Sequence, residues 1–243
     1  MLREFLKLGA TCAALAVFFT PLEAARKITR ERNVGALTPV PFGAIALNCS
    51  IWVVYGIIVR DWVPLVASNA VGSASGVYCL GVFARHAKPP LQLHARRLRT
   101  GVVGGFACLL FAARGAMWRG VDKAAPAGGD LAAWDAGLLE LVGRVGVGAC
   151  VAMFASPLST IKRVLSTRST ASMAPSVTLA SAACSLLWTL YGRDIDDLYV
   201  WGPNVAGLAF SLAQLGLFGI FGMPPAPADM SGLPPLLDIE LAR

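Results

Sequence analysis

A short pattern of aromatic, glycine and asparagine residues occurs twice in this chain, in the same order. The stretch Trp52–Gly56 (WVVYG) returns 136 positions later as Trp188–Gly192 (WTLYG). The residues that follow the two copies are Asn69 with Gly72 and, 135 positions later, Asn204 with Gly207. A repeat of this kind predicts two structural units of similar fold, related by a pseudo-symmetry axis.

The repeat lies in an apolar chain. Of its 243 residues, 56% are hydrophobic and 14% are charged, whereas soluble domains carry about 25% charged residues. A membrane-spanning helix needs about 20 mostly apolar residues. Seven windows of this kind occur, at about 5–22, 39–59, 62–84, 100–119, 138–160, 174–192 and 198–221. We therefore predict an all-α membrane protein with seven transmembrane helices.

Basic residues gather in the loops after the first, third and fifth windows. They are Arg26, Lys27, Arg30, Arg32, Arg85, Lys88, Arg96, Arg97, Arg99, Lys162, Arg163 and Arg168. The opposite loops carry most of the acidic residues, including Asp194, Asp196 and Asp197. The positive-inside rule places the basic loops in the cytoplasm, the amino terminus outside and the carboxyl terminus inside. Topology thus explains the net charge of +7, and we expect no nucleic-acid partner.

Each copy of the repeat holds three spans, and an odd number of spans reverses the direction of the next unit. The basic loops indicate that both copies point the same way, so one extra span must lie between them. The 100–119 window has no partner in the repeat and supplies it. We expect two parallel three-helix bundles plus one linker helix, a 3+1+3 plan. The expected divisions are a first three-helix repeat at 1–88, a linker helix and outer loop at 89–137 (the loop itself at 120–137), a second repeat at 138–222 and a disordered cytoplasmic tail at 223–243.

The repeated Trp and Asn residues fall well inside the membrane. Trp52 lies roughly 12 Å from the outer end of its helix, and Asn69 lies roughly 10 Å into the next one, at 1.5 Å per residue. Trp188 and Asn204 repeat this placement. Two indoles and two carboxamides can then face each other across the pseudo-two-fold axis. An interfacial aromatic belt is the alternative explanation for the tryptophans.

A buried Asn has two interpretations. It can form an interhelical hydrogen bond worth about 0.6–2 kcal/mol, or it can bind a ligand, because an amide left unbonded in an apolar medium costs about 2–7 kcal/mol. Two Asn at matching repeat positions, each after a matching Trp, favour the ligand site. Indole faces and amide groups suit a neutral polyhydroxylated ligand. No carboxylate is expected near the middle of the membrane, which favours transport without ion coupling.

Four prolines lie toward the inner ends of their spans and are candidate hinges: Pro21, Pro41, Pro157 and Pro175. Proline removes a backbone hydrogen bond and bends a helix. A simple helix boundary is the alternative, above all for Pro41 and Pro175, which follow loops closely. The six cysteines have no metal-ligand spacing, and we expect neither a metal nor another cofactor.

These motifs resemble the SWEET family of sugar facilitators, in the wider MtN3/saliva group. The matching stretches are Thr38–Phe42 (TPVPF), Asn48–Gly56 (NCSIWVVYG), Asn69–Gly72 (NAVG), Ala155–Ser159 (ASPLS), Leu187–Gly192 (LWTLYG) and Pro203–Gly207 (PNVAG). The resemblance covers about residues 5–221. One departure is Met173-Ala174-Pro175, where the family normally has Met-Pro, so the hinge in the sixth span is expected to be displaced.

The resemblance implies roles for individual residues. Trp52, Asn69, Trp188 and Asn204 would form a sugar pocket. Further lining or size-tuning positions would be Asn48, Cys184, Ala14, Val17, Ala149 and Ala152, and the small size of Val17 and the alanines favours a larger sugar. The four prolines would form a hinge set, and Tyr55 and Tyr191 would lie by the outer gate. The implied function is energy-independent transport of mono- or disaccharides across the bilayer by alternating access.

Other protein classes fit less well. A proton-coupled carrier of the Pro-Gln-loop type would need Pro-Gln where both copies read Pro-Leu. A seven-helix receptor would not have the internal sequence repeat. A retinal protein needs a Lys in the last span, and this span has none. A structural protein would be expected to have a long extramembrane domain, which the sequence does not predict. Enzyme activity is not expected, because the histidines, His86 and His94, share one loop without a nucleophile nearby. We expect the plasma membrane, with internal membranes and homo-oligomers left open.

Overall fold

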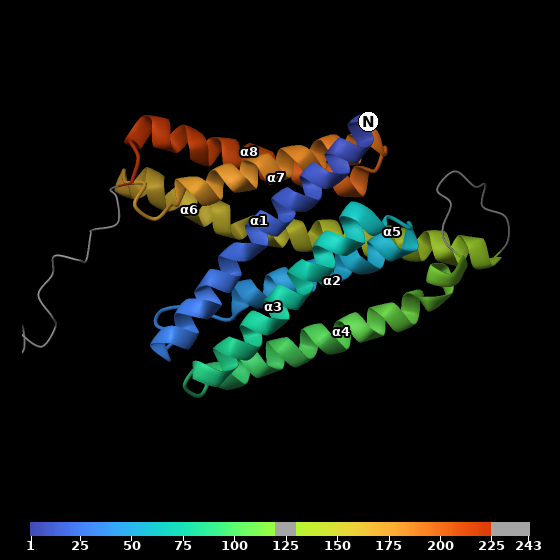
Figure 1. Ribbon diagram of the computed structural model, residues 1–243, viewed down its shortest axis with the longest axis horizontal. Coiled ribbons are helices and arrows are strands. Elements are labelled where there is room, and N and C mark those ends of the chain that lie inside the picture. Colours follow the sequence, from blue (N-terminus) through green and yellow to red (C-terminus); the bar gives the residue numbers. More distant parts are fainter. Residues whose placement is uncertain (120–129, 225–243) are drawn as a thin grey trace, which may run out of the picture.

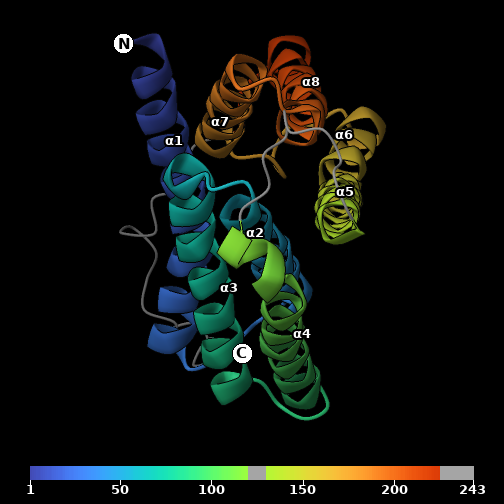
Figure 2. The same cartoon turned by 90° about the vertical axis from the view of Figure 1, so that its right-hand side faces the viewer.

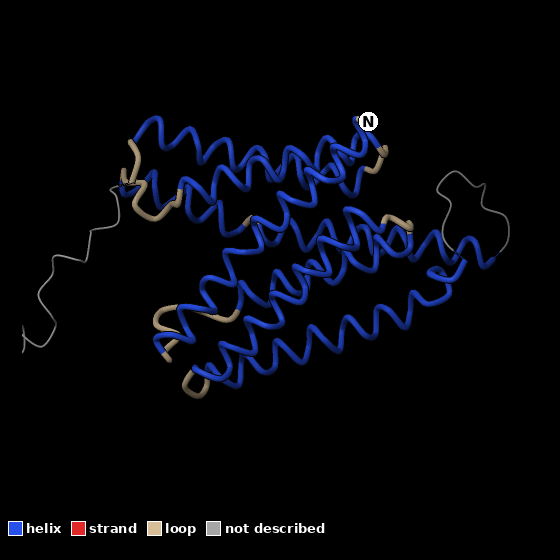
Figure 3. Tube along the Cα trace, viewed as in Figure 1, coloured by secondary structure: helices blue, strands red, loops and turns tan. Residues whose placement is uncertain are grey.

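The structure is a computed structural model that describes residues 1–119 and 130–224, and within these ranges it is built of helices and short turns (Figures 1 and 3). The helices are α1 (Leu2–Glu31), α2 (Val40–Ile58), α3 (Ala67–His86), α4 (Leu91–Arg119), α5 (Asp130–Met153), α6 (Ala155–Thr167), α7 (Pro175–Asp194) and α8 (Leu198–Phe221), with a short π-helical turn, η1 (Trp62–Val66), before α3.

Helices α5 and α6 are two halves of one predicted span. The break lies at Phe154, between Met153 and Ala155. Pro157 has no N–H to donate to the carbonyl of Met153, four residues earlier, and its ring clashes there, so the helix cannot continue unbroken. With α5 and α6 counted together, the described chain has the seven predicted spans.

Five segments are long and apolar enough to cross a membrane by length and hydropathy. They are Leu2–Glu31, Val40–Ile58, Trp62–His86, Ala136–Thr167 and Leu198–Phe221. Helices α4 and α7 complete the set of seven but are not among these five. Both carry more polar residues, and α4 begins in the basic segment around Arg96.

The packing confirms the predicted 3+1+3 arrangement. In each repeat the third helix lies between the other two: α3 contacts α1 and α2, and α8 contacts α7 and the α5/α6 span. The repeats meet through two equivalent contacts, α1 with α7 and α2 with α5. The linker helix α4 lies against α2 and α3, on the outside of the first bundle (Figure 2).

Some predicted boundaries differ from the structure. Helix α1 continues past Pro21 to Glu31, nine residues beyond the predicted window. The outer loop predicted at 120–137 is wrong at its end, because α5 begins at Asp130. The leucine and alanine residues that follow Asp130 are strong helix formers. Residues 120–129 of that loop and most of the tail, 225–243, lie outside the described residues.

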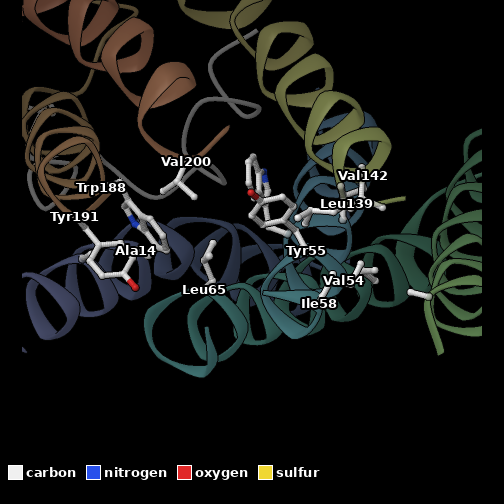
Figure 4. Close-up of a cluster of buried hydrophobic side chains, with 14 of the residues drawn as sticks. Ala14, Val54, Tyr55, Ile58, Leu65, Leu139, Val142, Trp188, Tyr191 and Val200 are labelled. Carbon is white, nitrogen blue, oxygen red and sulfur yellow. The ribbon is translucent and has the colours of Figure 1, made fainter. Parts of the chain in front are cut away.

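The apolar core shows that the bundles are closed at one end and separate at the other. One cluster combines residues of both repeats, among them Ala14, Tyr55, Leu139, Trp188 and Val200 (Figure 4). At the opposite end each bundle has a core of its own, around Phe83 in the first and around Phe218 in the second. The shared end carries the α2–α3 and α7–α8 turns, the end predicted to be outside (Figure 1).

The two turns at the closed end have the same backbone geometry. Arg60 and Asp196, 136 positions apart, have φ values of 58° and 52°. The next residues, Asp61 and Asp197, each donate a backbone hydrogen bond of 2.8 Å to the carbonyl five residues earlier. The repeat thus extends beyond the aromatic motif and gives two aspartates equivalent places at the closed end.

Candidate binding site

A cavity of about 180 Å³ lies between the two repeats. It takes residues from α1, α2, η1, α3, α5, α7 and α8, so both bundles contribute. Its lining residues are Ala14, Val17, Phe18, Asn48, Trp52, Leu65, Ser68, Asn69, Cys150, Cys184, Trp188, Val200 and Asn204. No Asp, Glu, Lys, Arg or His is among them.

The two asparagines have the same hydrogen bond in each repeat. The side-chain nitrogen of Asn69 donates to the backbone carbonyl of Leu65 at 2.9 Å, and that of Asn204 donates to the carbonyl of Val200 at 2.8 Å. Both bonds span only four residues of the chain, so neither is the interhelical bond considered from the sequence. Each bond uses one N–H of an amide that lines the cavity, and an amide also has a second N–H donor and an oxygen acceptor.

The two tryptophans are also placed alike. Trp52 packs edge-on against Tyr55 with ring centroids 5.4 Å apart, and Trp188 packs edge-on against Tyr191 at 6.1 Å. Each indole is at least nine-tenths buried. Figure 4 shows Trp188 beside Ala14 of the other repeat. The indoles therefore belong to the interior of the protein and not to an aromatic belt facing lipid.

Most of the predicted lining residues meet at this cavity, and two do not. Trp52, Asn69, Trp188, Asn204, Asn48, Cys184, Ala14 and Val17 all line it. Ala152 is exposed and lies elsewhere, and Ala149 is also absent from the lining. From the same helix, α5, it is Cys150 that lines the cavity, and its thiol lies 3.4 Å from the side-chain oxygen of Asn48. The side-chain direction near the break at Phe154 could not be fixed from spacing alone.

Sequence reasoning missed five lining residues: Phe18, Leu65, Ser68, Cys150 and Val200. A signal for two of them was present, because Leu65 and Val200 stand four residues before the paired asparagines and so share their helix face. Phe18 lies where Gly72 leaves room; a Cβ on Gly72 would be 2.6 Å from its ring. The cavity volume of about 180 Å³ is smaller than the about 300–1,000 Å³ that is typical of sites for drug-sized ligands. It therefore does not support the expectation of a larger sugar.

Two tyrosine–aspartate pairs close the end of the molecule above the cavity, the end predicted to be outside. The hydroxyl of Tyr55 donates to both carboxylate oxygens of Asp197, at 3.0 and 2.8 Å. In the reciprocal pair the hydroxyl of Tyr191 donates to Asp61 at 2.5 Å. Each bond joins one repeat to the other. The tyrosines lie where the resemblance implied an outer gate, but the aspartates were not predicted, although they share the repeat offset of 136.

An ion pair at the surface adds a third link between the repeats. Arg3 of α1 contacts Asp194 at the end of α7, at 2.6 Å. Below it, Asp61 is largely removed from water, and this burial raises the pKa of its carboxyl group. The hydrogen bonds from Tyr191 and from the N–H of Leu65 lower that pKa and offset part of the effect.

The four candidate hinge prolines have different surroundings. Pro41 and Pro175 lie in the first turns of α2 and α7, where proline is well tolerated. Pro21 lies inside α1, and Pro157 follows the α5/α6 break. Of the four, Pro21 and Pro157 therefore lie in the interior of a candidate span, whereas Pro41 and Pro175 lie where a helix begins. A hinge role for the set stays a prediction.

Comparison with known proteins identifies the family. The family model described as "Sugar efflux transporter for intercellular exchange" (MtN3_slv) matches residues 4–90 and 140–226. Sugar transporter SWEET1 of Mus musculus is 30% identical over 88% of this chain and 89% of its own length, and bidirectional sugar transporter SWEET11 of Arabidopsis thaliana is 27% identical over 86% of this chain and 67% of its own. The chain belongs to the SWEET (MtN3/saliva) family.

A solved structure agrees with this assignment. A eukaryotic SWEET transporter, solved at 3.7 Å, superposes with a TM-score of 0.76 at 25% identity, covering 90% of this chain and 96% of that one. The similarity confirms the predicted fold class and the resemblance on which the site prediction partly rests. Together with its apolar helices, it makes this chain an integral, multi-pass membrane protein.

Proposed function

We propose that this protein carries mono- or disaccharides across a membrane, down their concentration gradient. The observation that carries the proposal is the uncharged cavity between the repeats, in which each bundle presents one Trp and one Asn in equivalent positions. Indole faces pack against the C–H surfaces of a sugar ring, and amides donate to and accept from hydroxyl groups. The names of the relatives point to the same class of substrate.

The transport step in this proposal is alternating access. The outer end is closed by the Tyr55–Asp197 and Tyr191–Asp61 hydrogen bonds, while the inner ends of the bundles keep separate cores. Opening the outer end and joining the inner ends would expose the same cavity to the other side. Pro21 and Pro157, at equivalent places in the two repeats, would absorb the change in helix direction.

Transport without ion coupling rests on the chemistry of the cavity. A coupled carrier usually uses a membrane-embedded carboxylate or a cation site. The cavity lining contains neither Asp nor Glu, and the two aspartates of the gate, Asp197 buried and Asp61 partly buried, lie above it, at the closed end. The proton-coupled carrier is the competing proposal, and Asp61 and Asp197 are the groups it would have to use.

Labelled-sugar uptake tests the proposal. Cells lacking their own sugar carriers and expressing this protein should take up glucose, fructose or sucrose, and Trp188→Ala should abolish uptake without lowering the amount at the surface. Dissipating the proton gradient should leave uptake unchanged. Normal uptake by Trp188→Ala would contradict the site, and a large loss on dissipating the gradient would favour the coupled carrier.

We also propose that the protein resides in the plasma membrane with its amino terminus outside. The basic residues at the helix ends and turns that join α1 to α2, α3 to α4 and α6 to α7 support this orientation through the positive-inside rule. Tags at the two termini, probed in intact and permeabilised cells, test it. Staining of the amino-terminal tag only after permeabilisation would contradict it.

A further inference from the structure

A second cavity, distinct from the one between the repeats, lies between α3 and α4. Its volume is about 670 Å³. Its lining residues belong to the ends of α3 and α4 that are joined by the short α3–α4 turn, and Figure 1 shows this turn and the two helices side by side. Its polar side chains are Arg85, Arg96, Arg99 and Thr100. Small and apolar residues of both helices, including Ala84 and Val103, form the rest of its wall.

Three arginines meet here because of helix geometry. Arg96 and Arg99 are three residues apart on α4, so they share one face of that helix. Helix α3 runs back alongside α4, and Arg85 stands one residue before its end. Gly81, one turn earlier on α3, lets Arg99 lie close: a Cβ there would be 3.3 Å from its Nη1 atom.

The cavity has a charge that nothing in the described protein neutralises. In residues 1–119 and 130–224 no carboxylate forms an ion pair with Arg85, Arg96 or Arg99. All three arginines are exposed, so water and salt screen part of the repulsion between their guanidinium groups, and an anion between the groups would lower it further. The planar fork of a guanidinium matches the oxygens of a phosphate group, often in two parallel hydrogen bonds.

The place of the cavity in the membrane adds a second argument. It lies at the end that carries the basic residues, which the proposed orientation places in the cytoplasm. Anionic lipid headgroups occupy the cytoplasmic leaflet, and basic pockets between helices on the cytoplasmic side bind such headgroups. Arg99 is roughly 12 Å into α4, at 1.5 Å per residue. The cavity therefore runs from the headgroup level toward the apolar layer, where Ala84 and Val103 would meet the glycerol and acyl part of a lipid.

We propose that this cavity binds a phosphate group, carried either by the headgroup of an inner-leaflet lipid or by a soluble phosphate. The site is independent of the sugar cavity, with which it shares no lining residue. Because α4 also packs against α2, a phosphate bridging α3 and α4 would hold the linker helix against the first repeat.

Direct binding to the purified full-length protein in detergent tests the proposal. The probes are dioctanoyl phosphatidylinositol bisphosphate, inorganic phosphate and, as a reference without a phosphate group, dioctanoylglycerol. The test variant is R85Q/R96Q/R99Q. The matched control, R26Q/K27Q/R97Q, removes three positive charges from exposed residues at the same end that do not line the cavity.

The wild type and the control variant should bind one or both phosphate probes, and the test variant should bind at least about tenfold more weakly, since charged hydrogen bonds are lost. Binding of the inositol lipid but not of inorganic phosphate identifies a lipid as the source. Comparable binding of inorganic phosphate identifies a soluble phosphate. Equal affinities of the test and control variants, or no preference of the wild type for the phosphate probes over dioctanoylglycerol, would overturn the proposal.

Single substitutions keep the test decisive if the triple variant does not fold. Arg85→Gln, Arg96→Gln and Arg99→Gln should each weaken phosphate binding severalfold, whereas Arg97→Gln, on the same helix but outside the cavity, should not. If all four variants bind alike, the arginine cavity is not the binding site.

Discussion

The hydroxyl of Tyr55 donates a hydrogen bond to Asp197, 142 positions later in the chain, and thereby joins the first repeat to the second at the closed end of the molecule. The same bond recurs with the roles exchanged, from Tyr191 to Asp61. Each repeat therefore donates one equivalent hydrogen bond to the other across the pseudo-symmetry axis. This closed state also has the cavity of paired Trp and Asn residues directly beneath it.

Removing the tyrosine hydroxyl should open the outer end. Tyr55→Phe loses a hydrogen bond to a charged group, worth about 1.5–3 kcal/mol, which corresponds to a shift of about tenfold to hundredfold in the ratio of closed to open molecules. Distances between spin labels at the outer ends of α2 and α7 should lengthen. Tyr191→Phe should act in the same direction. Tyr78→Phe, at an exposed site on α3, is the control, and identical distances in all three variants would refute the gate.

Asn69 allows the two interpretations of a buried amide to be separated. Its side chain donates to the carbonyl of Leu65, only four residues earlier, and alanine is the better helix former. Asn69→Ala should therefore abolish sugar uptake while thermal stability stays nearly unchanged. Asn204→Ala, which loses the equivalent bond to Val200, should behave alike. A large fall in the unfolding temperature with uptake retained would instead indicate that the amides hold the helices together.

Gly192 is expected to be essential for packing. A Cβ at this position would lie 2.7 Å from the backbone nitrogen of Trp201, and the backbone cannot move aside as a flexible side chain does. Gly192→Ala should lower stability by about 1–3 kcal/mol, typical of overpacked sites. Gly202→Ala is the matched control, because its nearest contact would be an ordinary 3.5 Å to Leu198. Thermal unfolding of the two variants measures the difference, and equal melting temperatures would contradict the close approach.

Asp61 is expected to make the closed end of the molecule sensitive to pH. Burial raises the pKa of its carboxyl group in the closed state, so this state binds a proton more readily than an open state with a hydrated Asp61. The resulting stabilisation is complete below the ordinary pKa and is lost as the pH rises through the raised pKa. Lowering the outer pH from about 7 to about 4 should therefore increase the closed fraction, as read from the spin-label distances.

The control for this prediction is a neighbouring acid at the same surface. Asp61→Asn should remove the pH dependence, whereas Asp196→Asn, at an exposed position, should retain it. If acidification opens the gate, or if the Asp61→Asn variant responds to pH as the wild type does, the buried carboxyl is not the sensor.

The sequence by itself determined the number of spans, the two copies and most of the residues that meet in the cavity. Runs of apolar residues reveal burial in lipid, and repeated positions must take up equivalent places. The spacing also predicted that Trp52, Asn69, Trp188 and Asn204 share one level in the bundle.

Only the tertiary structure decided which side chains touch across the repeats. How the bundles pack decides that Tyr55 pairs with Asp197 and that Phe18 lines the cavity. Where α5 ends decides that Cys150, and not Ala152, lines the cavity. The three arginines between α3 and α4 are likewise spread over two helices and line one cavity only after these have folded back. Periodicity and hydropathy are local properties, whereas such contacts are set by the relative placement of helices far apart in the chain.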